Sequence, residues 1–220
     1  MARKVLILLF FGLGLYYVFF FETIDSSLKM VFKLLPMILL IALAFLSKVH
    51  VKSPYYWLIS IGLIFCAVGD YTLQWFIVGL IFFLIGHIFY IFAFRSTNQQ
   101  NTPLYVKIIL ALYGTLMMFW IAGSLQQKGD TVLAIAVTAY IFVILTMGWT
   151  SFRTGSKFAV IGAILFIMSD SVLAINRFMF DVPYSHILIM FTYYGAQFFL
   201  MLSIFDYDKI SSKTEIKSVE

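Results

Sequence analysis

The sequence predicts an all-α fold, a polytopic membrane helical bundle of eight transmembrane helices. Hydrophobic residues make up 63% of the chain and charged residues only 11%, whereas a soluble domain is closer to half apolar and a quarter charged. The apolar residues also gather in runs of about 20, the length that a helix needs to cross a bilayer. Both observations indicate a protein whose helices lie in lipid.

The apolar runs define the predicted spans, which are separated by short loops that favour antiparallel neighbours. Pro54, Pro103 and Pro183 each come just before a span, where a missing N–H group costs a helix nothing. Pro36 lies inside a span and is expected to kink it. The predicted spans cover residues 5–21, 28–46, 55–74, 76–94, 104–125, 131–150, 157–175 and 184–204.

These spans form one expected transmembrane domain, residues 1–205, followed by a polar tail, residues 206–220, that we interpret as disordered. Arg3 and Lys4 precede an apolar run, as in a signal peptide. However, the segment 16–21 is bulky and aromatic and offers no small-residue cleavage site, so the first run is interpreted as a retained span.

The distribution of basic residues predicts the orientation. Eleven of the 15 Lys and Arg residues fall in the N-terminal segment, the even-numbered loops or the tail. Cytoplasmic segments of membrane proteins carry such an excess. We therefore expect both termini in the cytoplasm. The four basic residues expected on the opposite side are Lys29, Lys33, Lys128 and Arg177.

Several function classes are excluded by the composition and the motifs. The net charge of +5 is not a nucleic-acid footprint, because the basic residues sit in short loops and not on one face. The sequence contains no P-loop, no Gly-rich dinucleotide motif, no G-x-S-x-G and no H-E-x-x-H, and Cys66 has no partner cysteine. A metal would need His87 and two aspartates. We expect no cofactor, no metal and no nucleic-acid partner.

Two aspartates interrupt the apolar spans, in the blocks Gly69-Asp70-Tyr-Thr-Leu73 and Ser169-Asp170-Ser-Val-Leu173. A carboxylate at the bilayer centre costs at least about 2.5–3.5 kcal/mol on insertion scales, so each is a functional-site hypothesis. Aligned on the two aspartates, the chain has the same residue types one hundred positions apart: Ile61, Gly62, Ile64, Asp70 and Leu73 correspond to Ile161, Gly162, Ile164, Asp170 and Leu173. This recurrence raises the hypothesis of two four-helix pseudo-repeats.

Polar residues on several predicted spans lie at similar depths in the membrane. A rise of about 1.5 Å per residue puts both aspartates about 20 Å from the cytoplasmic face, with Lys33 at a comparable level. Asp170 and Arg177 share a helix face, and so do His87 and Tyr90. If the helices bundle, these groups converge on one polar pocket. Asn176, Tyr193, Tyr194 and Gln197 add polar groups from the last two spans.

Each of these residues also has a structural interpretation. The aspartates could pair with Lys33 and Arg177 simply to hold helices together. His87 could be a hydrogen-bonded interior histidine, and Arg177 could extend to the membrane interface. The Phe and Tyr residues that recur along the fourth and eighth spans are interpreted as packing and lipid contacts. The sequence leaves these alternatives open.

A series of short motifs along the chain indicates a family: Lys33-Leu-Leu-Pro36, Gly69-Asp70-Tyr-Thr-Leu73, Gly86-His87-Ile-Phe-Tyr90, Gly162-Ala163, Ser169-Asp170-Ser-Val-Leu173-Ala174, Arg177-Phe178 and Tyr194-Gly-Ala-Gln197. In these motifs and their spacing the sequence resembles the YhhN-type membrane proteins, a family that includes the lysoplasmalogenases. One departure is Leu34, where the family pattern Lys-Pro-Leu-Pro has proline.

The resemblance implies hydrolysis of the vinyl ether bond of a lysoplasmalogen, giving a fatty aldehyde and glycerophosphoethanolamine or glycerophosphocholine. Acid hydrolysis of a vinyl ether begins with proton transfer to carbon and leaves an oxocarbenium ion, the type of cation that paired carboxyls handle in glycosidases. We hypothesise that Asp70 and Asp170 are the catalytic pair, with acid and base unassigned. His87 is the third expected catalytic residue, orienting a carboxyl group or the water.

The expected substrate is a lysophospholipid within the membrane, and the resemblance suggests the endoplasmic reticulum or another endomembrane. Lys33 and Arg177 are expected to hold the lipid phosphate. An alternative function is a small proton-coupled transporter, or a lipid-binding membrane protein, that uses the same aspartates. The oligomeric state is not predicted. The remaining expected substrate-binding residues are Tyr90, Asn176, Tyr194 and Gln197.

Overall fold

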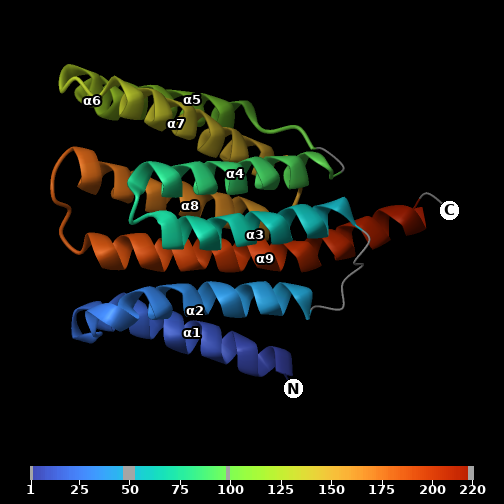
Figure 1. Cartoon of the computed structure of the whole chain (residues 1–220). Coiled ribbons are helices and arrows are strands. Elements are labelled where there is room, and N and C mark those ends of the chain that lie inside the picture. The colour runs from blue at the N-terminus through green and yellow to red at the C-terminus, as the bar shows by residue number, and fades with distance from the viewer. Residues whose placement is uncertain (1, 47–52, 98–99, 218–220) are drawn as a thin grey trace.

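The computed structural model describes residues 2–46, 53–97 and 100–217. Their regular structure is entirely helical, without strands in these ranges, which confirms the predicted fold class (Figure 1). Eight helical segments are long and apolar enough to cross a membrane. They are Arg3–Thr23, Ser26–Phe45, Pro54–Thr72, Phe76–Arg95, Leu104–Gln127, Thr131–Ser151, Lys157–Phe178 and Ser185–Tyr207.

The fifth span contains an irregularity, a five-residue π-helical segment between α5 and α6. Such segments are rare and are often found at functional sites. The helices of the described residues are α1 (Ala2–Phe20), α2 (Ser26–Phe45), α3 (Pro54–Thr72), α4 (Phe76–Arg95), α5 (Leu104–Met117), the π-helix η2 (Met118–Ala122), α6 (Gly123–Gln127), α7 (Thr131–Ser151), α8 (Lys157–Phe178) and α9 (Ser185–Lys217), with a short 3-10 turn η1 (Phe21–Thr23) after α1.

Side-chain caps define where several helices begin. The first backbone N–H groups of a helix have no partner within it, and a preceding Asp or Ser side chain can accept from them. Asp25 accepts from the amide of Ser27 at 2.9 Å, and this contact together with the Ser27 hydroxyl lowers the pKa of Asp25. The other side-chain caps are Ser53 before α3, Asp130 before α7 and Ser156 before α8.

The helices are arranged in layers (Figure 1). The pair α1 and α2 lies on one side, the helices α3, α4, α8 and α9 form the centre, and α5, α6 and α7 lie on the other side. The most extensive packing joins α3 to α4 and α8 to α9. The start of α1 and the end of α9 lie at the same end of the bundle, which we call the terminal end. The opposite end, with the connections α1–α2, α3–α4, α6–α7 and α8–α9, is the distal end.

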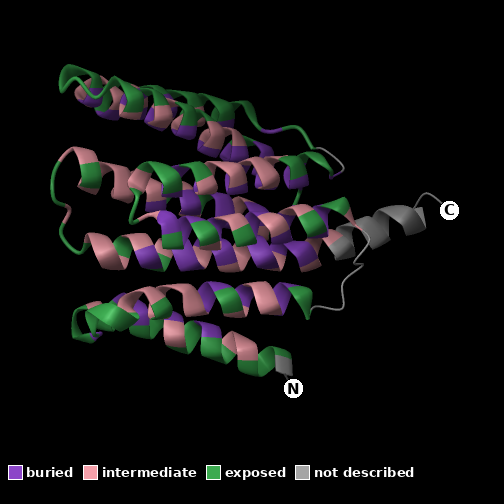
Figure 2. Cartoon of the chain, viewed as in Figure 1, coloured by how far each residue is buried: buried purple, intermediate pink, exposed green. Residues whose placement is uncertain are grey.

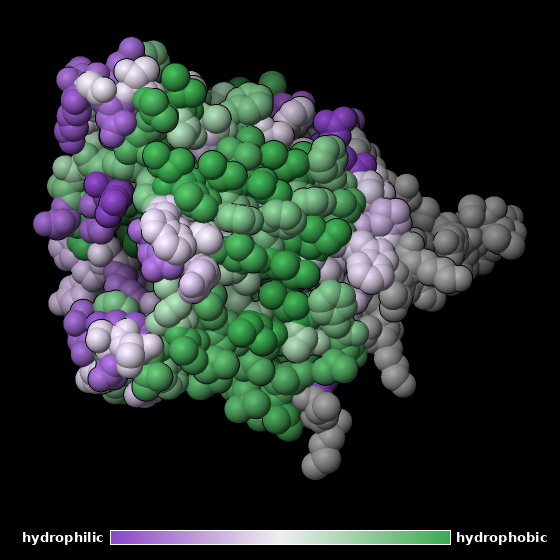
Figure 3. All heavy atoms as spheres, in the orientation of Figure 1, coloured by the Kyte–Doolittle hydropathy of each residue, from purple (hydrophilic) through white to green (hydrophobic). Residues whose placement is uncertain are grey.

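The outer surface of the bundle is apolar. Buried residues concentrate in the central helices (Figure 2), while large apolar side chains such as Leu8, Leu112 and Phe142 are exposed on the outer ones. Figure 3 shows a broad hydrophobic band across the middle of the molecule, with hydrophilic side chains toward its distal end. An exposed apolar surface of this extent fits a bilayer and not water. The chain is an integral, multi-pass membrane protein.

Two glycines of the recurrent sequence blocks lie where helices approach closely. A Cβ on Gly62 would come within 2.3 Å of the Tyr90 ring on α4, and one on Gly162 within 2.8 Å of Leu200 on α9. Small residues allow this close packing between membrane helices. The two glycines therefore have equivalent roles in the pairs α3–α4 and α8–α9. The pseudo-repeat remains a prediction.

The last helix extends further than the sequence analysis expected. Its backbone is helical to Lys217, where a disordered tail was expected from residue 206. Packing also continues past residue 205, because Asp206 accepts from the Ser156 hydroxyl at 2.6 Å and Tyr207 stacks on Tyr55 with ring centroids 4.6 Å apart. These contacts hold the first turn of the tail to the bundle and continue the helix.

The close approach at Gly162 gives a stability prediction. Gly162→Ala should lower the free energy of unfolding by about 1–3 kcal/mol, because the added methyl group overpacks the α8–α9 contact. Gly12→Ala is the matched control, since nothing lies within 4 Å of that position. Thermal unfolding in detergent measures both. Equal losses in the two variants would contradict the contact as the cause.

Candidate functional site

A cavity between the central helices and the α5–α7 layer contains both intramembrane aspartates. The space between its walls is about 890 Å³, including the part that is open to the outside. Its walls are largely apolar, from residues such as Leu73, Phe83 and Ile144. The structure thus brings Asp70 and Asp170 to one pocket. The polar lining residues are Lys33, Asp70, Tyr113, Tyr140, Ser169, Asp170, Ser171 and Tyr193.

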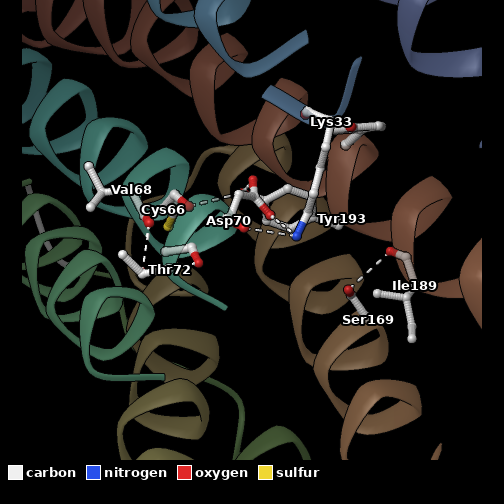
Figure 4. A network of polar contacts seen from close by, with 10 residues as sticks. Lys33, Cys66, Val68, Asp70, Thr72, Ser169, Ile189 and Tyr193 are labelled. Atoms are coloured by element: carbon white, nitrogen blue, oxygen red, sulfur yellow. Dashed lines mark hydrogen bonds and ion pairs between the residues drawn. The ribbon is translucent and has the colours of Figure 1, made fainter. Parts of the chain in front are cut away.

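Asp70 is the centre of a polar network that joins three helices (Figure 4). The Lys33 ammonium group on α2 lies 3.3 Å from its carboxylate and donates to its backbone carbonyl at 3.1 Å. The Tyr193 hydroxyl on α9 donates to the other carboxylate oxygen at 2.6 Å. Only 3% of the Asp70 side chain is exposed. Asp70 is therefore buried, and its charge is compensated.

Asp170 has different surroundings. Its carboxyl group accepts a hydrogen bond from the Tyr140 hydroxyl on α7, and no cation lies within ion-pair distance of it among the described residues. The next residue, Ser171, hydrogen-bonds to Tyr113 on α5. Asp170 is only partly buried and lines the cavity. The two carboxyl groups share a cavity but differ in charge compensation and access.

The position of Lys33 depends on a second tyrosine of α9. The Tyr194 hydroxyl donates to the Lys33 carbonyl at 2.8 Å, which links α9 to α2. Pro36, one turn further along α2, has no N–H to continue the local helical pattern. The carbonyl that Pro36 leaves without a helical partner is that of Phe32, so the Tyr194 contact lies at the next residue and joins α9 to α2 there. Tyr194 acts on Lys33 through the backbone and does not line the cavity.

His87, Tyr90 and Gln197 lie behind the cavity wall and do not line it. All three are fully buried, and the Tyr90 hydroxyl donates to the Gln197 carbonyl oxygen at 2.7 Å. The His87 ring packs edge-on against Phe166 and Tyr140, with centroids 4.4 and 5.4 Å away. Within the described part of the chain, neither His87 nitrogen nor the Gln197 amide nitrogen has a hydrogen-bond partner. His87 thus contacts the tyrosine that holds Asp170, not a carboxyl group.

Asn176 and Arg177 lie at the distal end of α8, outside the cavity lining. The Asn176 side chain accepts from the amide of Val182 at 2.9 Å and fixes the turn into α9. Arg177 is exposed, and its guanidinium group lies over the Phe76 ring, 5.2 Å from the centroid. The structure does not bring either residue to the carboxyl pair.

Sequence reasoning named Tyr193 only as an added polar group, and it did not name Tyr140, which holds Asp170, or Tyr113, which contacts Ser171. Tyr113 and Tyr140 lie within the apolar spans 104–125 and 131–150. A buried tyrosine hydroxyl usually needs a partner, and this was the available signal. Which polar group each hydroxyl meets depends on how α5, α7 and α8 pack, and no single span reveals that.

The part of the chain that matches a known protein family includes the residues that line the cavity. The model of the YhhN family matches residues 28–204, which include every cavity-lining residue. The chain belongs to the YhhN family. No solved structure matches it.

Proteins named lysoplasmalogenase, from animals and from a bacterium, are similar in sequence to this chain. Lysoplasmalogenase TMEM86B of Sus scrofa is 35% identical over 78% of this chain and 73% of its own length. Lysoplasmalogenase TMEM86A of Homo sapiens is 35% identical over 66% of this chain, and the match covers 64% of the human protein. A lysoplasmalogenase of Mycobacterium bovis is 29% identical over 68% of this chain and 60% of its own length. The chain thus spans about two thirds of the length of these relatives.

The Lys33–Asp70 pair gives a prediction that does not depend on activity. Lys33→Ala leaves a buried carboxylate without its cation, so the free energy of unfolding should fall by about 3–5 kcal/mol. The double variant Lys33→Met, Asp70→Asn has no buried charge and should recover most of this loss. Thermal unfolding in detergent provides the measurement.

Lys29→Met is the matched control on the same helix. The Lys29 ammonium group lies 4.0 Å from the centroid of the Phe21 ring, so its removal should cost only about 0.5–1 kcal/mol. If Lys33→Ala were as stable as this control, the ion pair would not hold the helices together.

Proposed function

We propose that this protein hydrolyses the vinyl ether bond of a lysoplasmalogen, within the membrane, by paired-carboxyl chemistry. The proposal rests on one observation: Asp70 and Asp170 both line one apolar cavity, and their partners differ. The family and the relatives named lysoplasmalogenase support the reaction class and the substrate. The products are a fatty aldehyde and glycerophosphoethanolamine or glycerophosphocholine.

The unequal surroundings support an assignment of roles. The negative charge of Asp70 is matched by Lys33 at 3.3 Å and by the Tyr193 hydroxyl, and both contacts stabilise a carboxylate. Asp170 faces an apolar cavity with a neutral phenol as its partner. An unpaired charge is costly there, so the neutral acid is favoured. Asp170 is therefore the proton donor and Asp70 the fixed negative charge.

The first step is proton transfer from Asp170 to the alkenyl carbon that is not bonded to oxygen. The electron pair of the carbon–carbon double bond forms the new C–H bond, and the ether oxygen shares a lone pair with the neighbouring carbon. The resulting oxocarbenium ion is stabilised by the Asp70 carboxylate across the cavity. Fixed charges in a site that excludes water stabilise such a cation without reorganisation.

In the second step, water attacks the cationic carbon and gives its proton to Asp170, which restores the acid. The hemiacetal then breaks its bond to the glycerol oxygen, which takes up the hydroxyl proton. This releases the fatty aldehyde and glycerophosphoethanolamine or glycerophosphocholine. Tyr140 and Tyr193 keep the two carboxyl groups in place throughout. His87 acts behind Tyr140 as a positioning residue for Asp170.

The same proposal includes a location. We infer that the protein resides in the endoplasmic reticulum or another endomembrane, with both termini in the cytoplasm. The compartment is what the resemblance of the motifs to the family implies, and the distribution of Lys and Arg supports the orientation. In this orientation the distal end of the bundle faces away from the cytoplasm.

The carboxyl pair is tested by aldehyde release from a defined lysoplasmalogen. Asp70→Asn and Asp170→Asn should each lower kcat by at least about 100-fold, the usual scale of acid–base catalysis. Asp206→Asn is the matched control, because Asp206 contacts Ser156 and does not line the cavity. The saturated ether analogue should give no aldehyde with any variant. Near-normal turnover in either of the first two would exclude the pair mechanism.

Proton transfer to carbon has its own signature. In D2O, the aldehyde, reduced at once to the alcohol, should carry one deuterium on the carbon next to the former carbonyl. Turnover should also be slower in D2O, because the O–H bond of the acid breaks in the first step. Mass spectrometry and initial rates measure the two effects. An aldehyde without deuterium would rule out this step, whichever carboxyl group is the acid.

A further inference from the structure

Two cations, Lys128 and Arg177, each contact one residue of an aromatic pair at the distal edge of the cavity. The Lys128 ammonium group donates to the Phe178 carbonyl at 3.2 Å. The Arg177 guanidinium group lies 5.2 Å from the centroid of the Phe76 ring. Phe76 and Phe178 contact edge to face at 5.4 Å, and both line the cavity. Both cations therefore contact residues at the rim of the cavity.

Neither cation has an acidic partner. Among the described residues, the ion pair found is Lys33–Asp70, and no carboxylate lies within 4.0 Å of Lys128 or Arg177. The nearby Asp130 instead caps α7 by accepting from the amide of Leu133. Two uncompensated positive charges at the rim of an apolar cavity favour an anionic group of the ligand.

Distances along the substrate indicate which group this is. Seven bonds separate the phosphorus of a lysoplasmalogen from the carbon that takes up the proton. An extended chain advances about 1.2 Å per bond, by analogy with the 3.8 Å spacing of Cα atoms, so the separation is about 8 Å. Asp170 and Arg177 are seven residues apart on α8, which is about 10 Å of helix rise. A phosphate at Arg177 therefore leaves the vinyl ether at Asp170.

Lys33 does not meet this requirement. Its ammonium group lies 3.3 Å from the Asp70 carboxylate and is therefore level with the carboxyl groups. A phosphate bound there would occupy the position of the vinyl ether. It would also compete with Asp70 for its compensating charge.

We propose that Arg177 and Lys128 bind the headgroup phosphate of the substrate, while Lys33 remains the partner of Asp70. The inference rests on the proposed function and identifies the part of the substrate that each end of the cavity recognises. Arg177 offers a planar fork of donors that suits phosphate oxygens, and Lys128 adds a point charge. The alkenyl chain then runs from the rim, past the carboxyl groups, between the apolar walls.

Binding of two ligands that cannot be hydrolysed tests the proposal. These are 1-O-hexadecyl lysophosphatidylethanolamine, which carries the phosphate, and 1-O-hexadecylglycerol, which lacks it. In the double variant Arg177→Gln, Lys128→Gln, the Kd of the phosphate-bearing ligand should rise about tenfold or more, as expected for lost charge-assisted hydrogen bonds. The Kd of hexadecylglycerol should stay within twofold, which also reports that the variant is folded.

Lys29→Gln is the matched control, because Lys29 is also basic and lies toward the distal end, but the Phe21 ring that it contacts does not line the cavity. It should leave both Kd values unchanged. An unchanged Kd for the phosphate-bearing ligand in the double variant would overturn the proposal. So would an equal weakening of both ligands.

Soluble glycerol 3-phosphate separates a headgroup site from a site for free phosphate. It should displace the phosphate-bearing ligand only at concentrations at least about 100-fold higher, because it lacks the buried chain. Displacement at equal concentrations would remove the lipid assignment. Since neither ether is cleaved, these binding results are independent of aldehyde release. Loss of aldehyde release with intact headgroup discrimination would count against the hydrolase and not against this site.

Discussion

A carboxylate in the hydrocarbon layer is stable only if other groups compensate its charge, and much of this structure satisfies that requirement at Asp70. Lys33 supplies the cation from α2 and Tyr193 supplies a hydrogen bond from α9. Tyr194 in turn holds the backbone of Lys33. Three helices far apart in sequence are thus joined at one buried group. The ion pair is costly to form and more costly to break, which makes it a constraint on how these helices pack.

Asp170 lies in different surroundings, and the proposed mechanism depends on this contrast. One carboxyl group carries a matched charge, and the other meets a neutral tyrosine beside apolar walls. In the proposed mechanism this difference gives the two side chains different charge states, with Asp170 as the acid and Asp70 as the fixed negative charge. The same proposal gives Tyr140 and Tyr193 the role of holding the two carboxyl groups in place.

Small residues make this arrangement possible. Gly62 and Gly162 let α3 approach α4 and α8 approach α9, so each aspartate-bearing helix has a closely packed neighbour. The remaining space lies between these pairs and the α5–α7 layer, where the cavity is found. Among the residues that the structure describes, the His87 ring nitrogens and the Gln197 amide nitrogen are buried without a hydrogen-bond partner. Buried polar atoms without a hydrogen-bond partner are uncommon in protein interiors, and in this respect His87 and Gln197 differ from ordinary core residues.

The sequence by itself determined the fold class, the eight spans and the two aspartates, because each follows from local composition. A run of about 20 apolar residues must be a helix in lipid, and a carboxyl group within it is costly wherever the helix lies. Only the tertiary structure decided the partners. Lys33 pairs with Asp70, Tyr140 holds Asp170, and Arg177 lies over the Phe76 ring. The contacts of Tyr193 with Asp70 and of Tyr194 with Lys33 join residues 123 and 161 positions apart. Helical periodicity gives the face of each residue but not the helix that it meets.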